Sequence, residues 1–291
     1  MSTSTTAGRR RDRVAASRAA RSHDENFPVA FWLLPSDARA DMHALYAFCR
    51  ATDDLGDEGD PRLRLERLEA WREDTLRCFG GAPRDPRLRA LARTVARHGL
   101  ASDPFLRLIH ANVMDQRTDR WATYAGLLDY CDHSATPVGR MVLGVLGYRD
   151  AWRTQMSDAT CIGLQLANFW QDIGRDLRER GRVYLPLEHM EAFGVTEADL
   201  ALPRATPALR ELVAFEVDLA REWLDRGAPL ARVVPPSVAI DIRMFTAGGR
   251  AVCDAIARQG HDTLWRRPAP GRLGRARIAG SVLLALLRRQ T

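Results

Sequence analysis

Apolar residues recur at helical spacing through most of the chain, in long segments rich in Ala, Leu and Arg and poor in strand-like alternation. We predict helices over 37–56, 62–79, 86–98, 103–116, 150–178, 207–226, 236–259 and 272–289. No linker rich in Pro, Gly or Ser divides the middle of the chain. We therefore expect one all-α domain over 23–291, preceded by a disordered Arg-rich tail over 1–22.

A stripe of polar side chains runs along the helix predicted over 150–178. Its members are three or four residues apart and so share one side of that helix: Gln165, Asn168, Asp172 and Asp176. The rest of the circumference is largely apolar, which leaves little of this helix suited to water. A buried carboxylate is costly unless a cation compensates it. We interpret the stripe as half of a metal site.

A second polar stripe lies along the helix predicted over 37–56 and just beyond its end. It consists of Tyr46, Arg50, Asp53, Asp54, Asp57 and Glu58. Carboxylates without His or Cys favour Mg²⁺ over zinc. An acidic helix end is most often simply solvated, but two such stripes on two long helices favour a site. If the helices face one another, they enclose a cavity with Mg²⁺ and a diphosphate at its mouth and an apolar interior.

Such a cavity suits one kind of reaction, the ionisation of an isoprenoid diphosphate. Magnesium, guanidinium and phenol groups stabilise the charge that accumulates on diphosphate as the C–O bond breaks. The carbocation left behind needs a dry cavity until its intended quencher arrives.

Net charge and cysteine content narrow the possible binding partners and the cellular compartment. The net charge of +6 comes from basic residues in 1–22 and 263–291 around an acidic body, which argues against a nucleic-acid groove across the fold. The five Cys are scattered without a Cys-x-x-Cys motif, so we expect a reducing cytosol. No apolar run approaches the ~20 residues that span a bilayer. The basic start lacks the apolar region of a signal peptide.

The last segment, 270–291, reads as an amphipathic helix with Leu and Val on one face and Arg at both ends. It either lies in the interface at the inner face of the membrane, with Arg on lipid phosphates, or docks on the helical bundle. We favour the docked helix and keep peripheral membrane contact as the alternative.

The two stripes carry a family resemblance. The first reads Tyr46-x-x-x-Arg50-x-x-Asp53-Asp54-x-x-Asp57-Glu58, and the second reads Gln165-x-x-Asn168-x-x-x-Asp172-x-x-x-Asp176, followed by Arg182-Val-Tyr184-Leu-Pro186. In this order and separation they resemble the motifs of the squalene/phytoene synthase family, over about His23 to residue 265. The resemblance implies the isoprenoid synthase fold, a helical bundle with a central active-site cavity.

Three further stretches are similar to the bacterial branch that forms hydroxysqualene for hopanoids: Glu25-Asn-Phe-Pro-Val-Ala, Ser134-Ala-Thr-Pro-Val-Gly139 and Asn168-Phe-Trp-Gln-Asp172. This likeness implies that Mg²⁺ assists loss of diphosphate from presqualene diphosphate and that water captures the cation. It also implies a functional link to the enzymes that make presqualene diphosphate and reduce hydroxysqualene.

The resemblance also implies roles for single residues. Two or three Mg²⁺ ions would be held, directly or through water, by Asp53, Asp54, Asp57, Asn168, Asp172 and Asp176. The diphosphate would be contacted, or the mouth closed, by Tyr46, Arg50, Gln165, Arg182 and Tyr184, with Asn168 also near the substrate. Tyr130 would orient the water or stabilise the cation; a packed core tyrosine is an equal alternative.

Alternatives remain. Ser-Ala-Thr at 134–136 and Gln171 depart from the carotenoid-forming branch, which makes condensation of two farnesyl diphosphates to presqualene diphosphate, or phytoene synthesis, the second choice. No Gly-x-Gly-x-x-Gly motif is present, and no NADPH is expected. A non-catalytic membrane-associated assembly factor is disfavoured by the intact acids, and a nucleic-acid binder by the charge distribution.

Overall fold

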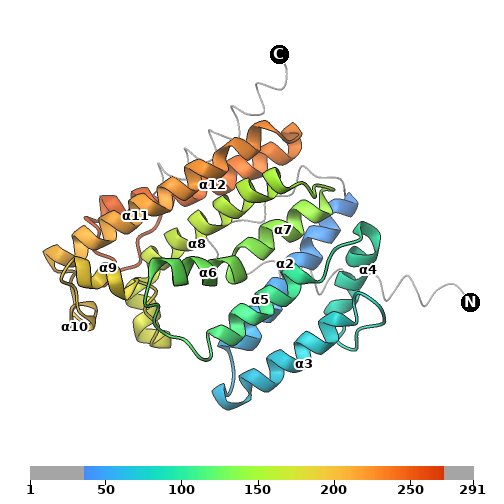
Figure 1. Cartoon of the computed structure of the whole chain (residues 1–291), viewed down its shortest axis with the longest axis horizontal. Coiled ribbons are helices and arrows are strands. Elements are labelled where there is room, and N and C mark those ends of the chain that lie inside the picture. The colour runs from blue at the N-terminus through green and yellow to red at the C-terminus, as the bar shows by residue number, and fades with distance from the viewer. Residues whose placement is uncertain (1–35, 272–291) are drawn as a thin grey trace, which may run out of the picture. The chain divides into compact units, whose positions relative to one another are not determined.

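The computed structural model describes residues 36–271. The predicted tail over 1–22 and helix over 272–289 lie outside that range. Within it the α-helices are α2 (Ser36–Asp57), α3 (Arg64–Leu76), α4 (Leu88–His98), α5 (Asp103–Met114), α6 (Tyr124–Ser134), α7 (Thr136–Val145), α8 (Ala151–Arg180), α9 (Leu187–Ala192), α10 (Glu197–Leu200), α11 (Pro207–Gly227) and α12 (Pro236–Arg258) (Figure 1). The only β contact found among these residues is an isolated bridge. The all-α prediction is confirmed.

The seven helices predicted inside 36–271 are all present, with ends within three residues of those expected. Four helices were not in the predicted set, namely α6, α7 and the short helices α9 and α10. The stretch from 123 to 147 forms two helices that meet at Ala135, and Pro137 occupies the first turn of the second, where its missing N–H costs nothing. Among the described helices none is long and apolar enough to cross a membrane.

The described chain divides into two compact units. Unit 1 comprises the residues up to Arg117 and Thr136–Thr154, and α2 packs there against α3, α4, α5 and α7 (Figure 1). Its core includes Phe48, whose ring stacks on Trp71 at 6.0 Å and meets the edge of Phe105 at 5.2 Å. These contacts hold the helix that bears the first acidic motif.

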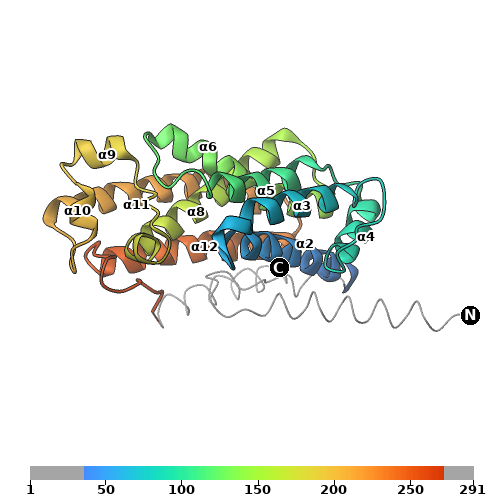
Figure 2. The same ribbon diagram turned by 90° about the horizontal axis from the view of Figure 1, so that it is seen from below.

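Unit 2 comprises Thr118–Ala135 and the residues from Gln155 on. Its helices α8, α11 and α12 approach closely around Leu224, because glycines face that side chain: a Cβ on Gly163 would lie 2.8 Å from Leu224, and one on Gly249 3.0 Å from it. Helices α11 and α12 pack against each other, and Figure 2 shows α9 and α10 near one end of α11. Close packing thereby fixes the helix that bears the second motif.

The end of α8 determines where the next site residues lie. Gly181 has a φ of +66°, a left-handed conformation that glycine adopts without strain, and it turns the chain out of the helix. The chain then runs beside residues 119–122: the Val183 N–H donates to the Asp119 carbonyl at 3.0 Å and the Leu187 N–H to the Trp121 carbonyl at 2.9 Å. Arg182 and Tyr184 are therefore carried on a segment with a fixed backbone.

Candidate functional site

The first motif lies on α2, in unit 1. Asp53 is exposed and Asp54 and Asp57 are half-buried, so the acids border solvent at the end of the helix. Arg50 is one turn from Asp54, and its Nε lies 3.0 Å from Asp54 Oδ1. An arginine predicted to bind diphosphate is thus held in place by one of the carboxylates predicted to bind metal. Tyr46 lies one turn earlier and is half-buried.

Two amides, one on α5 and one just beyond its end, hold the end of α2, and the sequence interpretation missed both. Asn112 donates to Asp53 Oδ1 at 3.3 Å, and Gln116 donates to the Gly56 carbonyl at 3.0 Å. A Cβ on Gly56 would lie 2.3 Å from Asn112 Oδ1, so only glycine admits this approach. The signal was present in the sequence, since two amides four residues apart share one helix face.

The second motif lies on α8, in unit 2. Gln165, Asn168 and Asp172 are half-buried, whereas Asp176 is only 5% exposed. Burial, with repulsion from Asp172, raises the pKa of Asp176 to about 6, although Arg180 lies 3.1 Å from its Oδ1 and opposes the rise. Two acids one turn apart in such surroundings favour a bound cation. The stripe thus ranges from half-buried to buried along α8, and its role in binding metal stays a prediction.

Asp172 has a partner that the sequence interpretation did not assign. Arg267 forms a two-pronged ion pair with it, Nε to Oδ1 at 2.5 Å and Nη2 to Oδ2 at 2.9 Å. The segment after α12 lies across α8 here, since Gln171 donates to the Pro268 carbonyl and Arg178 to the Leu264 carbonyl. Arg267 is in no helix, so no periodic pattern could have linked it with Asp172.

The remaining predicted residues, Tyr130, Arg182 and Tyr184, are all buried in unit 2, with exposures of 3%, 7% and 8%. The Tyr184 ring stacks on Phe169 of α8 with centroids 3.9 Å apart. Tyr130 lies 5.9 Å from Tyr184, so it is packed among rings and also adjoins a predicted site residue. The two alternatives drawn for Tyr130 are compatible here.

The donors suit magnesium. Both motifs offer oxygen ligands alone, and Mg²⁺ typically takes one or two carboxylates and completes its octahedron with water and phosphate oxygens. Within residues 36–271 no three His, Cys, Asp or Glu side chains converge tightly enough to hold an ion by themselves. Asp172 and Asp176 fit the role because their mutual repulsion in a buried setting is relieved by a cation.

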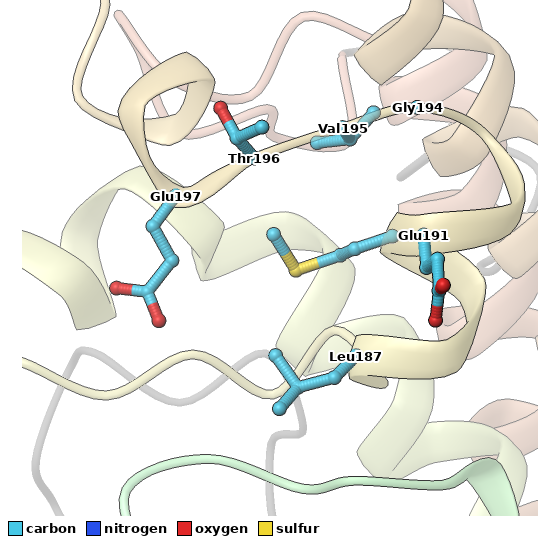
Figure 3. Close-up of a pocket in the computed structure, with 7 residues that line it drawn as sticks. Leu187, Glu191, Gly194, Val195, Thr196 and Glu197 are labelled. Carbon is cyan, nitrogen blue, oxygen red and sulfur yellow. The ribbon is translucent and has the colours of Figure 1, made fainter.

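A separate pocket of about 440 Å³ lies at α9 and α10, open to solvent. Figure 3 shows the Glu191 and Glu197 side chains on opposite sides of it, with Leu187 below them in this view. Glu197 already pairs with Arg120 at 2.6 Å. None of the predicted site residues lines this pocket, so we do not assign the chemistry to it.

The motifs are therefore intact on two units, each with defined partners. Unit 1 holds Tyr46, Arg50 and the first acids, and unit 2 holds the α8 stripe with Tyr130, Arg182 and Tyr184. The cavity expected between the two stripes stays a prediction.

Comparison with known proteins gives a consistent picture. The squalene/phytoene synthase family model matches residues 20–275 and so spans both units. The chain is 36% identical to hydroxysqualene synthase of Rhodopseudomonas palustris, over 74% of this chain and 73% of that protein. It is 34% identical to presqualene diphosphate synthase of the same species, over 67% and 70%.

Among solved structures, the crystal structure of squalene synthase HpnC from Alicyclobacillus acidocaldarius superposes with a TM-score of 0.80 at 45% identity, covering 87% of this chain and 95% of that one. Fold, motifs and sequence similarity agree. The chain belongs to the squalene/phytoene synthase family.

Proposed function

We propose that this protein is a Mg²⁺-dependent hydroxysqualene synthase that converts presqualene diphosphate and water into hydroxysqualene and diphosphate, for squalene and hopanoid synthesis. The observation that carries the proposal is the α8 stripe, where Asp172 and the buried Asp176 lie one turn apart beside the stacked rings of Phe169 and Tyr184. The acids for a metal–diphosphate head thus share α8 with Phe169, whose ring stacks on Tyr184 just beyond the end of that helix.

The head group would be bound by both motifs. When bound, Mg²⁺ neutralises charge on the diphosphate and makes it a better leaving group. Asp172, Asp176 and Asn168 would hold it on α8, and Asp53, Asp54 and Asp57 on α2. Arg50 and Arg182 would supply guanidinium donors to the diphosphate oxygens, whose charge increases as the C–O bond breaks.

The hydrocarbon part would lie against apolar and aromatic side chains. The negative face of an aromatic ring stabilises a nearby cation, so the buried ring of Tyr130 suits the positive charge left after ionisation, with the buried Tyr184 beside it. Their burial also excludes bulk water, which confines capture to a water molecule held in place. Tyr46, Gln165 and Tyr184 would contact the diphosphate or close the mouth.

The relatives support hydroxysqualene synthesis without excluding the condensation of two farnesyl diphosphates. One similar protein is named hydroxysqualene synthase and another presqualene diphosphate synthase. Their sequence identities to this chain are nearly equal, 36% and 34%. Condensation of two farnesyl diphosphates is therefore the second candidate. Ser134, Thr136 and Gln171, which depart from the carotenoid-forming branch, favour the water-capturing reaction.

The test is to incubate the pure protein with Mg²⁺, without NADPH, separately with farnesyl diphosphate and with presqualene diphosphate, and to identify the products by mass spectrometry. We expect hydroxysqualene and diphosphate from presqualene diphosphate and no product from farnesyl diphosphate. Turnover of farnesyl diphosphate, or inertness toward presqualene diphosphate, would overturn the proposal.

A variant checks the metal assignment. Asp172→Ala should abolish diphosphate release while the far-ultraviolet circular dichroism spectrum is retained. Asp218→Ala is the matched control, because Asp218 is 70% exposed on α11 and pairs with Arg221 away from the motif. Undiminished release by Asp172→Ala would refute the assignment. Peripheral membrane contact through 270–291 remains the alternative to a docked helix. Deletion of these residues should reduce sedimentation with anionic liposomes if the contact exists, and unchanged sedimentation would favour the docked helix.

A further inference from the structure

Two chain segments about sixty residues apart in sequence are joined at the site in unit 2. Besides the backbone bonds from Val183 and Leu187, the Glu188 N–H donates to the Ala122 carbonyl at 3.1 Å. Arg120 bonds the Gly181 carbonyl at 2.6 Å through its side chain. These bonds fix residues 119–122 against the segment that carries Tyr184, and they place Trp121 opposite that ring.

The result is a three-layer stack. The Trp121 ring lies 4.7 Å from Tyr184 at an interplanar angle of 22°, and Phe169 covers the other face of Tyr184 at 3.9 Å and 10°. Trp121 is 4% exposed and Phe169 is 5% exposed, so both outer layers are buried. The Tyr184 ring is held on both faces and cannot tilt without displacing one of them.

Tyr130 touches the edge of the same stack. Its ring centroid is 5.0 Å from Trp121, 5.9 Å from Tyr184 and 6.2 Å from Phe169. Trp121 and Phe169 therefore each contact both tyrosines assigned to the reaction, and Phe169 also fixes the stack to the helix bearing Asn168 and Asp172. The sequence interpretation gave Trp121 no role, since it lies between helices.

We propose that Trp121 is a positioning residue: it fixes the rings of Tyr184 and Tyr130, and through them it controls where water captures the carbocation. This inference rests on the proposed function. A cation with charge at several carbons yields different alcohols according to which carbon meets the water. Rings held in one orientation favour charge at one carbon, so a loosened stack should broaden the mixture of products.

Two substitutions separate ring stacking from volume. Trp121→Phe keeps a ring on Tyr184, whereas Trp121→Leu keeps apolar bulk without a ring. We expect Trp121→Leu to lower kcat about ten-fold at nearly unchanged KM, and to divert part of the hydroxysqualene into other C30 alcohols. Trp121→Phe should keep the product ratio of the parent protein. Trp223→Leu is the control, since its indole lies on α11 and bonds the Tyr124 hydroxyl.

The packing of the ring stack can also be measured without an activity assay, by the chemical accessibility of Tyr184. Nitration of Tyr184 by tetranitromethane, followed by peptide mass spectrometry, should be slow in the parent and in Trp121→Phe but faster in Trp121→Leu. Phe169→Leu uncovers the opposite face of Tyr184 and should also make nitration of Tyr184 faster. This second variant keeps the test available if Trp121→Leu does not fold.

The outcomes are distinct. Unchanged nitration in both leucine variants, or a product ratio that stays parental in Trp121→Leu while its rate falls, overturns the positioning role. If nitration rises as expected but the parent protein does not convert presqualene diphosphate, the proposed function fails and the structural part of the inference stands.

Discussion

At the scale of single residues, the site is defined by how each carboxylate is balanced. Asp54 has Arg50, Asp176 has Arg180, and Asp172 has Arg267, so an arginine lies within salt-bridge distance of each of these three motif acids. A metal ion that binds Asp172 must compete with a guanidinium already held by two bonds.

Exchange of Arg267 tests this competition. Without the Arg267 guanidinium, the repulsion between Asp172 and Asp176 is offset on the Asp176 side alone, by Arg180, so Arg267→Gln should lower stability by about 1–2 kcal/mol in the absence of metal. Added Mg²⁺ should then raise the melting temperature more in the variant than in the parent, as measured by differential scanning calorimetry. Arg226→Gln is the control, because its pair with Glu222 is 60% exposed on both sides. Equal gains from Mg²⁺ in parent and variant would contradict competition.

Asp241 on α12 is a buried carboxyl outside the two motifs. It is 2% exposed, and its Oδ1 has no hydrogen-bond partner in the described part of the chain. Burial raises the pKa of its carboxyl from 3.8 to about 7. The unfolded chain therefore loses this proton first, and stability falls as the pH rises from near 4 through about 7 and then levels off.

Asp241→Asn should remove that dependence and stabilise the protein by about 1–3 kcal/mol at about pH 8, with little effect at about pH 4. Urea unfolding at the two pH values measures the difference. Asp254→Asn on the same helix is the comparison, since Asp254 is 48% exposed and pairs with Arg221. A gain of equal size at both pH values would show that burial of the charge is not its cause.

At the scale of elements, α2 and α5 act together. The end of α2 depends on Gly56 fitting against Asn112. Helix propensity alone would favour alanine at position 56 by about 1 kcal/mol, but the overlap with Asn112 opposes this and costs typically about 1–3 kcal/mol. The steric term is the larger one.

Gly56→Ala should therefore destabilise the protein by about 1 kcal/mol, whereas Gly80→Ala, where a Cβ meets nothing within 4 Å, should change stability by less than about 0.5 kcal/mol. Thermal unfolding measures both. Asn112→Ala should suppress the cost of Gly56→Ala in the double variant; strictly additive effects would argue against the contact.

The helices also show how much of the fold the sequence alone predicts. Helices α2 and α8 were predicted because a polar stripe at helical period stands out on an apolar segment, and because Pro and Gly delimit their neighbours. The short helices α9 and α10 span six and four residues, too few for a period to show. Trp121 and Arg267 lie outside helices, and their roles depend on the path of the chain, which no local pattern encodes.

At the scale of the whole molecule, the family motifs are divided between two units. The acids of α2 belong to one unit and those of α8 to the other, while the family model covers both. The proposed reaction therefore requires residues from both units on one substrate. The net charge is also unevenly distributed, since the two ends of the chain are basic and the body between them is acidic.

The fate of the oxygen atom of water shows which bond of the substrate breaks. We predict that presqualene diphosphate, incubated with the protein and Mg²⁺ in ¹⁸O-labelled water, gives hydroxysqualene that carries the label and diphosphate that does not, because the C–O bond breaks and water adds to carbon. Labelled diphosphate together with an unlabelled alcohol that retains the cyclopropane would mean cleavage at phosphorus and would contradict the account.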